Sequence, residues 1–163
     1  MRSPVQNLWW IDLDDMLVPN VGDPPFAPLG GRVWAVMAVL LVEDDAGVRE
    51  CLREALADAG WRVAEAADAE AALDRMVADG MPGVLVTDLV LGSGMSGAAL
   101  IGAVRLRWPQ VHAVLISGAE VAEPALDPGD RFLRKPFELD DLVQTVSELI
   151  AEKAAANLNH AAA

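Results

Sequence analysis

The hydrophobic residues follow two different spacings along the chain from residue 38 onward. Short apolar runs bounded by polar residues or glycine are typical of buried strands. Five segments have this pattern: 38–42 (AVLLV), 61–66 (WRVAEA), 83–87 (GVLVT), 111–117 (VHAVLIS) and 131–135 (RFLRK). Between these runs, apolar residues recur three and four positions apart, which is the spacing of one helix face.

The segments with helical spacing also carry start and stop signals. The apolar face of the first is Val48, Cys51, Leu52, Ala55, Leu56 and Ala59, and Cys51 is expected to pack in the core. Short polar side chains are expected to cap the first turns at Asp45, Asp68 and Ser96. Helix-ending residues follow at Gly60, Gly80 and Pro109. The last helix is expected to contain residues 139–150.

Strands that are apolar on both faces and alternate with amphipathic helices predict a doubly wound α/β fold with a five-stranded parallel sheet. The crossover connections of such a sheet are right-handed. Ligands bind beyond the carboxyl ends of the strands in this kind of fold. The residues at those ends are therefore the candidates for chemistry.

The first 37 residues differ from the rest of the chain. They contain the loop-forming stretch VGDPPFAPLGG and show no clear helix or strand spacing. Two interpretations stay open: Met37 is the natural start, or residues 1–37 form an irregular arm that docks through Trp9, Trp10 and Trp34. The domain is expected to span residues 38–152, with a flexible alanine-rich tail at 153–163.

Composition and charge exclude several classes of function. The net charge is −13, and the chain has no cluster of Lys and Arg, which argues against binding to nucleic acid or an anionic membrane. No apolar stretch is long enough for a membrane span. The single cysteine, Cys51, excludes an internal disulfide and suits a reducing cytoplasm. Two histidines, His112 and His160, are too few for a zinc site, and His112 is expected to be structural.

Polar residues follow four of the five predicted strands. Glu43 and Asp44 follow the first, Asp88 the third, Ser117 lies at the end of the fourth, and Lys135 at the end of the fifth. Two carboxylates about 5 Å apart repel by roughly 3 kcal/mol at an effective dielectric constant of about 20. A divalent cation with hard oxygen ligands, such as Mg²⁺, would relieve this repulsion. With a lysine beside it, such a carboxylate can attack a phosphorus atom.

These residues resemble the response-regulator receiver domains of bacterial two-component signalling over about residues 38–150. The segments that carry the resemblance are LLVEDDAGVRECL, LVTDLVLGSGMSG, VLISG and FLRKPFELDDL. The resemblance implies a flavodoxin-like (βα)5 fold. The sequence also departs from the family pattern: the loop after Asp88 is one residue longer, and Gly92 stands where proline is usual. The segment between Ser117 and Lys135 is short and contains Pro124 and Pro128, so the fourth helix is expected to be shortened or irregular.

The resemblance implies a role for each strand-end residue. Asp88 would be the phosphoacceptor, with Ser117 and Lys135 contacting the phosphoryl oxygens. Asp44, Asp88 and the backbone carbonyl of Val90 would bind Mg²⁺, with Glu43 acting through water. Ser117 and Phe132 would form the conformational switch, and the bond between Lys135 and Pro136 would be cis. Val90 and Ala119 are apolar at positions that tune hydrolysis in the family, so neither can position an attacking water.

The leading functional hypothesis is a stand-alone receiver, because 13 residues follow Ile150. It would accept phosphate from a histidine kinase or a histidine phosphotransfer protein, and then pass it on or bind an unknown downstream protein. It would be a signalling phosphoacceptor rather than an enzyme, and a monomer is favoured because the fourth helix is altered. The alternative is a receiver-like scaffold that works without phosphorylation. A metal-dependent phosphatase is a weaker hypothesis, because Val90 stands where that reaction needs a second acid.

Overall fold

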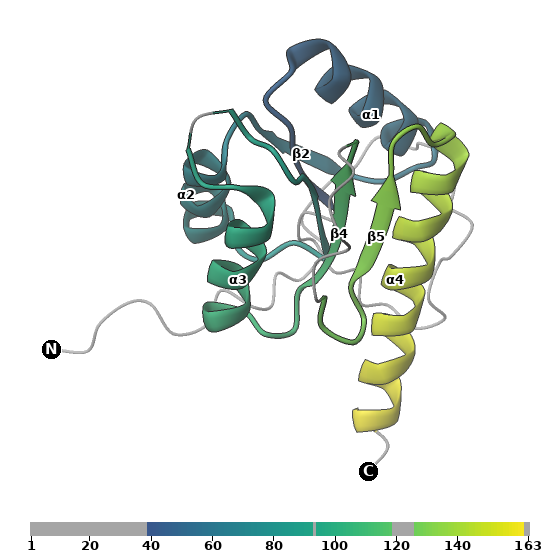
Figure 1. Cartoon of the computed structure of the whole chain (residues 1–163). Helices are drawn as coiled ribbons and strands as arrows, with labels where there is room; N and C mark the ends of the chain where they lie inside the picture. The colour runs from purple at the N-terminus through teal and green to yellow at the C-terminus, as the bar shows by residue number, and fades with distance from the viewer. Residues whose placement is uncertain (1–38, 93, 119–125, 162–163) are drawn as a thin grey trace, which may run out of the picture. The chain divides into compact units, whose positions relative to one another are not determined.

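The structure, a computed structural model, describes residues 39–92, 94–118 and 126–161 (Figure 1). The elements in chain order are β1 (Val39–Val42), α1 (Ala46–Asp58), β2 (Val63–Ala66), α2 (Ala69–Asp79), β3 (Val84–Asp88), α3 (Gly97–Arg107), β4 (His112–Ser117), β5 (Arg131–Arg134) and α4 (Leu139–Ala161). Residues 1–38 lie outside the described part, so both interpretations of the N-terminal segment stay open.

The five strands form one parallel sheet in the order β2-β1-β3-β4-β5. This confirms the predicted doubly wound α/β fold, and the strand order is the flavodoxin-like one. The register pairs Asp88 with Ile116, and Ser117 with Arg134. The carboxyl ends of β3, β4 and β5 therefore lie side by side at one edge of the sheet.

Helices cover both faces of the sheet. Figure 1 shows α2 and α3 on one side and α4 on the other. One buried cluster joins the sheet to α2 and α3 through residues such as Met76, Leu100 and Val104. The other joins it to α1 and α4 through residues such as Leu56, Leu142 and Leu149. Burial on both faces explains why the strands are almost continuously apolar.

The predicted helix caps are confirmed. Asp45 accepts hydrogen bonds from the N–H groups of Gly47 and Val48, at 2.8 and 2.9 Å. Asp68 and Ser96 each accept one from the N–H group three residues later. Gly60 and Gly80 have φ values of 90° and 92°, a conformation that favours glycine at helix ends.

Three expectations need correction or limitation. Cys51 is exposed and not in the core, because the buried stripe of α1 is narrow and centres on Leu52 and Leu56. The last helix continues to Ala161, well past residue 153, because alanine is the strongest helix former. The helix between β4 and β5, predicted to be shortened or irregular, concerns mainly residues 119–125, which lie outside the described part; the described residues 126–130 contain no helix.

Other sequence predictions are met. His112 lies in β4, where a strand was expected. Trp61 and Trp108 are partly buried and pack against the two cores. Within the described ranges, the helices do not include one that is long and apolar enough to cross a bilayer.

Candidate functional site

Asp88 is the last residue of β3, and the backbone around it is tightly fixed. Its side chain is almost completely buried, and its Oδ1 accepts a hydrogen bond of 2.9 Å from the N–H of Val90. The carbonyl of Asp88 accepts a hydrogen bond from the Thr87 hydroxyl at 3.0 Å. Leu89 donates to the carbonyl of Ile116 at 2.7 Å, which continues the pairing of β3 with β4. The carboxylate is therefore held at the carboxyl end of the sheet by the ends of two strands.

Lys135 brings a positive charge to this carboxylate. Its N–H donates to the carbonyl of Ser117 at 2.8 Å, so the end of β5 is fixed to the end of β4. Its Nζ forms an ion pair and hydrogen bond with Asp88 Oδ2 and lies 3.5 Å from Glu43 Oε2. The bond between Lys135 and Pro136 is cis, as expected. Residues 43, 88 and 135 are far apart in sequence, yet the sheet places their side chains in contact.

Glu43 is a buried acid with incomplete hydrogen bonding. It is 3% exposed, and its Oε1 accepts a hydrogen bond of 3.2 Å from the N–H of Asp45. Its Oε2 is buried and accepts no hydrogen bond within the described part of the chain. Burial raises the pKa of Glu43, and the charge of Lys135 only partly offsets this effect. The negative charge of Asp88 raises it further. Glu43 is thus an acid that the protein keeps in an unfavourable environment.

The charge of Lys135 is stabilised by these acids. Burial alone would lower the pKa of Lys135, but its hydrogen bond to Asp88 and the charges of Asp88 and Glu43 raise it above its ordinary value. Lys135 therefore stays protonated at neutral pH. An ammonium in this position can balance part of the charge on a bound anion.

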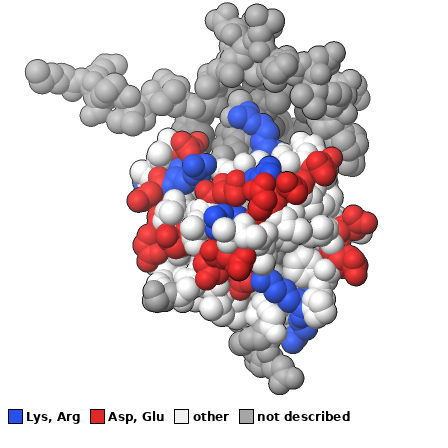
Figure 2. All heavy atoms as spheres, turned by 90° about the horizontal axis from the view of Figure 1, so that it is seen from above, with Lys and Arg blue, Asp and Glu red and all other residues white. Residues whose placement is uncertain are grey.

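Asp44 and Val90 complete the set predicted to bind a metal ion. Asp44 is exposed, and its Oδ2 lies 3.6 Å from where a Cβ at Gly92 would be, so its carboxylate faces the loop after β3. Val90 is 60% exposed in the same loop. Figure 2 views the molecule from this end and shows Asp and Glu side chains interspersed with Lys and Arg.

The donor set is compatible with Mg²⁺, although it is small. Among the described residues, no three His, Cys, Asp or Glu side chains are grouped closely enough to hold a metal ion. The predicted set needs two carboxylates, Asp44 and Asp88, with the carbonyl of Val90 as a third oxygen. Mg²⁺ commonly binds through one or two carboxylates and keeps several waters. The unsatisfied Oε2 of Glu43 is a suitable acceptor for one such water.

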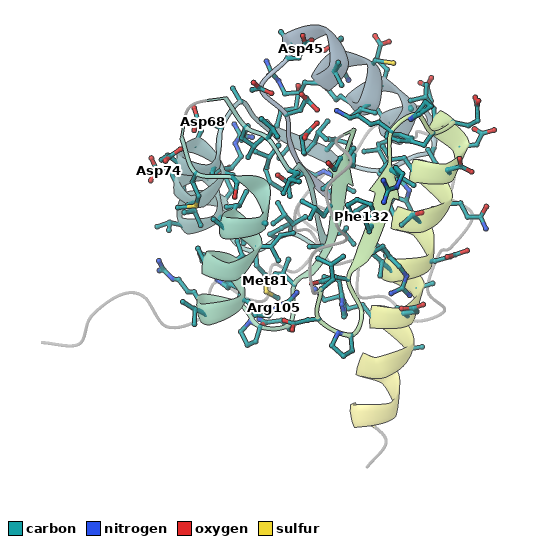
Figure 3. The ribbon with its side chains drawn as sticks, viewed as in Figure 1. Asp45, Asp68, Asp74, Met81, Arg105 and Phe132 are labelled. Atoms are coloured by element: carbon teal, nitrogen blue, oxygen red, sulfur yellow. The ribbon has the colours of Figure 1, made fainter. Side chains whose placement is uncertain are left out.

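The two predicted switch residues lie on neighbouring strands. Ser117 is the buried last residue of β4. Phe132, labelled in Figure 3, lies on β5 opposite Leu115 and is half-buried against the core that includes α2 and α3. The guanidinium of Arg134 lies 5.6 Å from the centre of the Phe132 ring. Ala119, the other predicted tuning position, lies outside the described residues.

Two residues near the site were missed by the sequence reasoning. Arg49 donates a hydrogen bond of 2.7 Å to the carbonyl of Glu43. Gly97 lies so close to Asp88 that an added Cβ would be 1.9 Å from the Asp88 carbonyl oxygen. The sequence signal for Gly97 was its place just after the Ser96 cap. Arg49 had no comparable signal, because an arginine in a first helical turn is usually solvated.

Comparisons with known proteins show the family. The response regulator receiver domain family matches residues 39–147. The C4-dicarboxylate transport transcriptional regulatory protein DctD of Pseudomonas aeruginosa is 34% identical over 126 residues, covering 75% of this chain and 26% of DctD. Sensor kinase CckA of Brucella abortus is 37% identical over 120 residues, covering 71% of this chain and 13% of the kinase. The chain thus matches about a quarter or less of the length of these relatives.

Solved structures show the same fold. A response regulator receiver protein from Sinorhizobium medicae is 26% identical with a TM-score of 0.67, and the match covers 73% of this chain and 98% of that protein. A receiver domain protein from Clostridium thermocellum has the same TM-score of 0.67 at 20% identity, over 72% of this chain and 97% of that one.

Proposed function

Because the chain belongs to the response-regulator receiver family, we propose that Asp88 accepts a phosphoryl group from a phosphohistidine. The donor would be a histidine kinase or a histidine phosphotransfer protein. The observation that carries this proposal is the contact of Lys135 Nζ with both Asp88 and Glu43 at the end of the sheet. It gives the candidate nucleophile a neighbouring cation and a neighbouring acid pocket.

In the proposed reaction, a carboxylate oxygen of Asp88 attacks the phosphorus atom. The new bond is P–O, the bond that breaks is P–N, and the imidazole of the donor leaves with the electron pair. The N–H of Val90, which contacts Asp88 Oδ1, orients the carboxylate. As the Lys135 ammonium moves away from the Asp88 carboxylate, it balances charge on a phosphoryl oxygen.

The proposed reaction requires Mg²⁺. Asp44, Asp88 and the carbonyl of Val90 would bind it directly, and Glu43 would bind it through water. When bound, Mg²⁺ supplies charge stabilisation for the phosphoryl oxygens and the attacking carboxylate. The chain would act as a signalling phosphoacceptor. It would catalyse only its own phosphorylation and dephosphorylation.

Phosphorylation of Asp88 would be communicated through Ser117 and Phe132. We propose that the Ser117 hydroxyl moves toward the phosphoryl group and lets Phe132 rotate inward, which shifts a pre-existing equilibrium. A downstream protein would then bind the altered surface of β5. Ser117→Ala should still be phosphorylated but should lose the Phe132 shifts that phosphorylation produces in an NMR spectrum. If phosphorylation shifted the Phe132 signals in Ser117→Ala as much as in the wild type, this step would be disproved.

The test of the proposed phosphoacceptor is labelling with radioactive acetyl phosphate and Mg²⁺. The wild-type protein should incorporate label, and Asp88→Asn should incorporate none. Asp45→Asn is the matched control, because Asp45 is a neighbouring acid that caps α1 and asparagine caps equally well. It should be labelled like the wild type. Label in Asp88→Asn would refute the assignment. A wild-type protein that takes no label would favour the alternative of a phosphorylation-independent scaffold.

A further inference from the structure

Arg49 connects α1 to the turn that carries the acid pair. Its Nη1 lies 2.7 Å from the carbonyl oxygen of Glu43 and 3.5 Å from that of Asp44. The shorter distance is a strong hydrogen bond from a charged donor, and the longer one is at the limit of such a contact. The side chain is 20% exposed, so much of its stem is covered by protein. Arg49 thus contacts the backbone of both residues of the acid pair.

A second contact holds the guanidinium at another of its nitrogen atoms. Arg49 Nε lies 3.5 Å from Glu65 Oε2, and Glu65 lies in β2 opposite Leu41 of β1. The guanidinium is planar and rigid, so contacts at two of its nitrogen atoms define its orientation. The side chain therefore bridges β2 and the turn after β1.

The orientation of this turn determines where the Asp44 carboxylate lies. The chain passes directly from the end of β1 through Glu43 and Asp44 to the Asp45 cap of α1. The Asp44 carboxylate faces Gly92, in the loop that follows Asp88 at the end of β3. A rotation of the peptide between Glu43 and Asp44 would move this carboxylate away from that loop.

We infer that Arg49 is a positioning residue for the acid pair, holding the turn so that Asp44 faces the Mg²⁺ position. This inference rests on the proposed function, because it assigns Asp44 to the metal. Arg49 itself contacts neither the metal position nor the phosphoryl group. Residues that orient metal ligands typically change metal affinity by about 10- to 100-fold when they are replaced.

Arg53 provides a matched control on the same helix. It lies one turn after Arg49 and also pairs with Glu65, with Nε 3.7 Å from Oε1. Its other partners are Glu50 and Glu54, both on α1. None of these partners belongs to the acid turn. Replacing Arg53 therefore removes the same charge and a contact with the same glutamate, while the turn keeps its hydrogen bond.

The experiment compares the Mg²⁺ affinity of Arg49→Met and Arg53→Met in titrations monitored by NMR. Arg49→Met should bind Mg²⁺ about 10-fold more weakly than the wild type. Arg53→Met should stay within about twofold. In the metal-free proteins, the carbonyl ¹³C shifts of Glu43 and Asp44 should change in Arg49→Met and not in Arg53→Met. Acetyl phosphate labelling of Arg49→Met should recover when the Mg²⁺ concentration is raised about 10-fold.

The lysine variants distinguish a specific loss of Mg²⁺ affinity from a folding defect. Arg49→Lys keeps the charge, but its single ammonium cannot reach both Glu65 and the turn with the geometry of the guanidinium fork. It should show an intermediate loss of Mg²⁺ affinity, while Arg53→Lys should show none. Equal affinity in the two arginine-49 variants and the wild type would overturn the inference. If the wild type itself bound no Mg²⁺, the proposed function would fail first, and that outcome is recognised without any variant.

Discussion

Asp130 at one end of the sheet and Glu43 at the other are both buried acids, but their hydrogen bonding differs. At the amino end of β4 and β5, both oxygens of Asp130 are bonded: Oδ1 accepts from the N–H of Ala113 at 2.8 Å, and Oδ2 accepts from Arg105 at 2.5 Å. At the carboxyl end, Glu43 has one oxygen without a hydrogen bond in the described part. Figure 3 shows Arg105 at the end of the molecule opposite Asp45.

The difference separates structural from functional electrostatics. Arg105 also donates to the carbonyls of Pro109 and Val111, so it joins α3 to the segments before β4 and β5. Both oxygens of the buried Asp130 thus accept hydrogen bonds, as expected of an acid that only maintains the fold, although Arg105 Nε and His112 Nδ1 at this end have no hydrogen-bond partner in the described part. At the other end Lys135 pairs with Glu43 and Asp88, and Oε2 of Glu43 accepts no hydrogen bond in the described part. Proteins accept such unfavourable arrangements where a ligand is to be bound.

The largest effect on stability is expected at the structural end. Asp130→Ala would leave the Arg105 charge and the Ala113 N–H without their acceptor, and it should lower the free energy of unfolding by about 3 kcal/mol. Asp127→Ala is the control, because Asp127 pairs with the same Arg105 at 2.9 Å but is 62% exposed. It should cost less than about 1 kcal/mol. Urea unfolding measures both, and equal losses would show that burial of Asp130 does not matter.

A somewhat smaller effect is expected for Gly97, which links the fold to the functional end. The Cβ of Gly97→Ala would lie 1.9 Å from the Asp88 carbonyl oxygen and 2.8 Å from the Thr87 hydroxyl. Relieving this overlap should cost about 2 kcal/mol and displace Asp88. In the same helix, an added Cβ at Gly102 would meet no other group within 4 Å, so Gly102→Ala should stabilise by about 0.5 to 1 kcal/mol.

Unfolding curves and acetyl phosphate labelling together test the Gly97 prediction. Gly97→Ala should lose both stability and labelling rate, whereas Gly102→Ala should gain stability and keep its labelling rate. If Gly97→Ala were as stable as the wild type, the close approach of α3 to the end of β3 would not be a constraint on the Asp88 backbone.

The difference between the two ends also explains what the sequence could predict. Parallel strands with apolar runs place their carboxyl ends together, so Glu43, Asp88 and Lys135 could be grouped from the amino-acid sequence alone. The caps at Asp45, Asp68 and Ser96 are local interactions within three residues, and local patterns reveal them. The parallel sheet and the site's composition were therefore predictable from spacing and residue type.

Long-range pairing left no comparable signal. Arg105 and Asp130 are 25 residues apart, and each alone is an ordinary charged residue near an element end. Arg49 looked like a solvated helix residue, and Cys51 looked like a core residue, because spacing alone does not show how wide the buried stripe is. One oxygen of Glu43 lacks a hydrogen bond because of how several elements pack around it. No local sequence pattern contains that information.

Among the variants of site and core residues, the smallest change in stability is predicted for Glu43, and the substitution is expected to stabilise the protein. Since burial raises the pKa of Glu43 above the ordinary value of 4.5, its ionised form is disfavoured in the folded protein. Its contribution to stability is present below that ordinary pKa and is lost as the pH rises through the higher folded value. Glu43→Gln should therefore stabilise the protein at pH 7 by about 1 kcal/mol, a typical gain when a functional site loses an unfavourable group.

The pH dependence of this gain distinguishes burial from other causes. The gain from Glu43→Gln should disappear as the pH falls below about 4.5, where Glu43 itself is neutral. Glu50 is the contrasting control, because its hydrogen bond with Arg53 lowers its pKa. Its contribution is present at neutral pH and is lost in acid, so Glu50→Gln should destabilise slightly at pH 7 and not at low pH. If Glu43→Gln were less stable at pH 7, the ion pair of Glu43 with Lys135 would outweigh its burial. The two ends of the sheet would then differ in composition rather than in how completely their acids are stabilised.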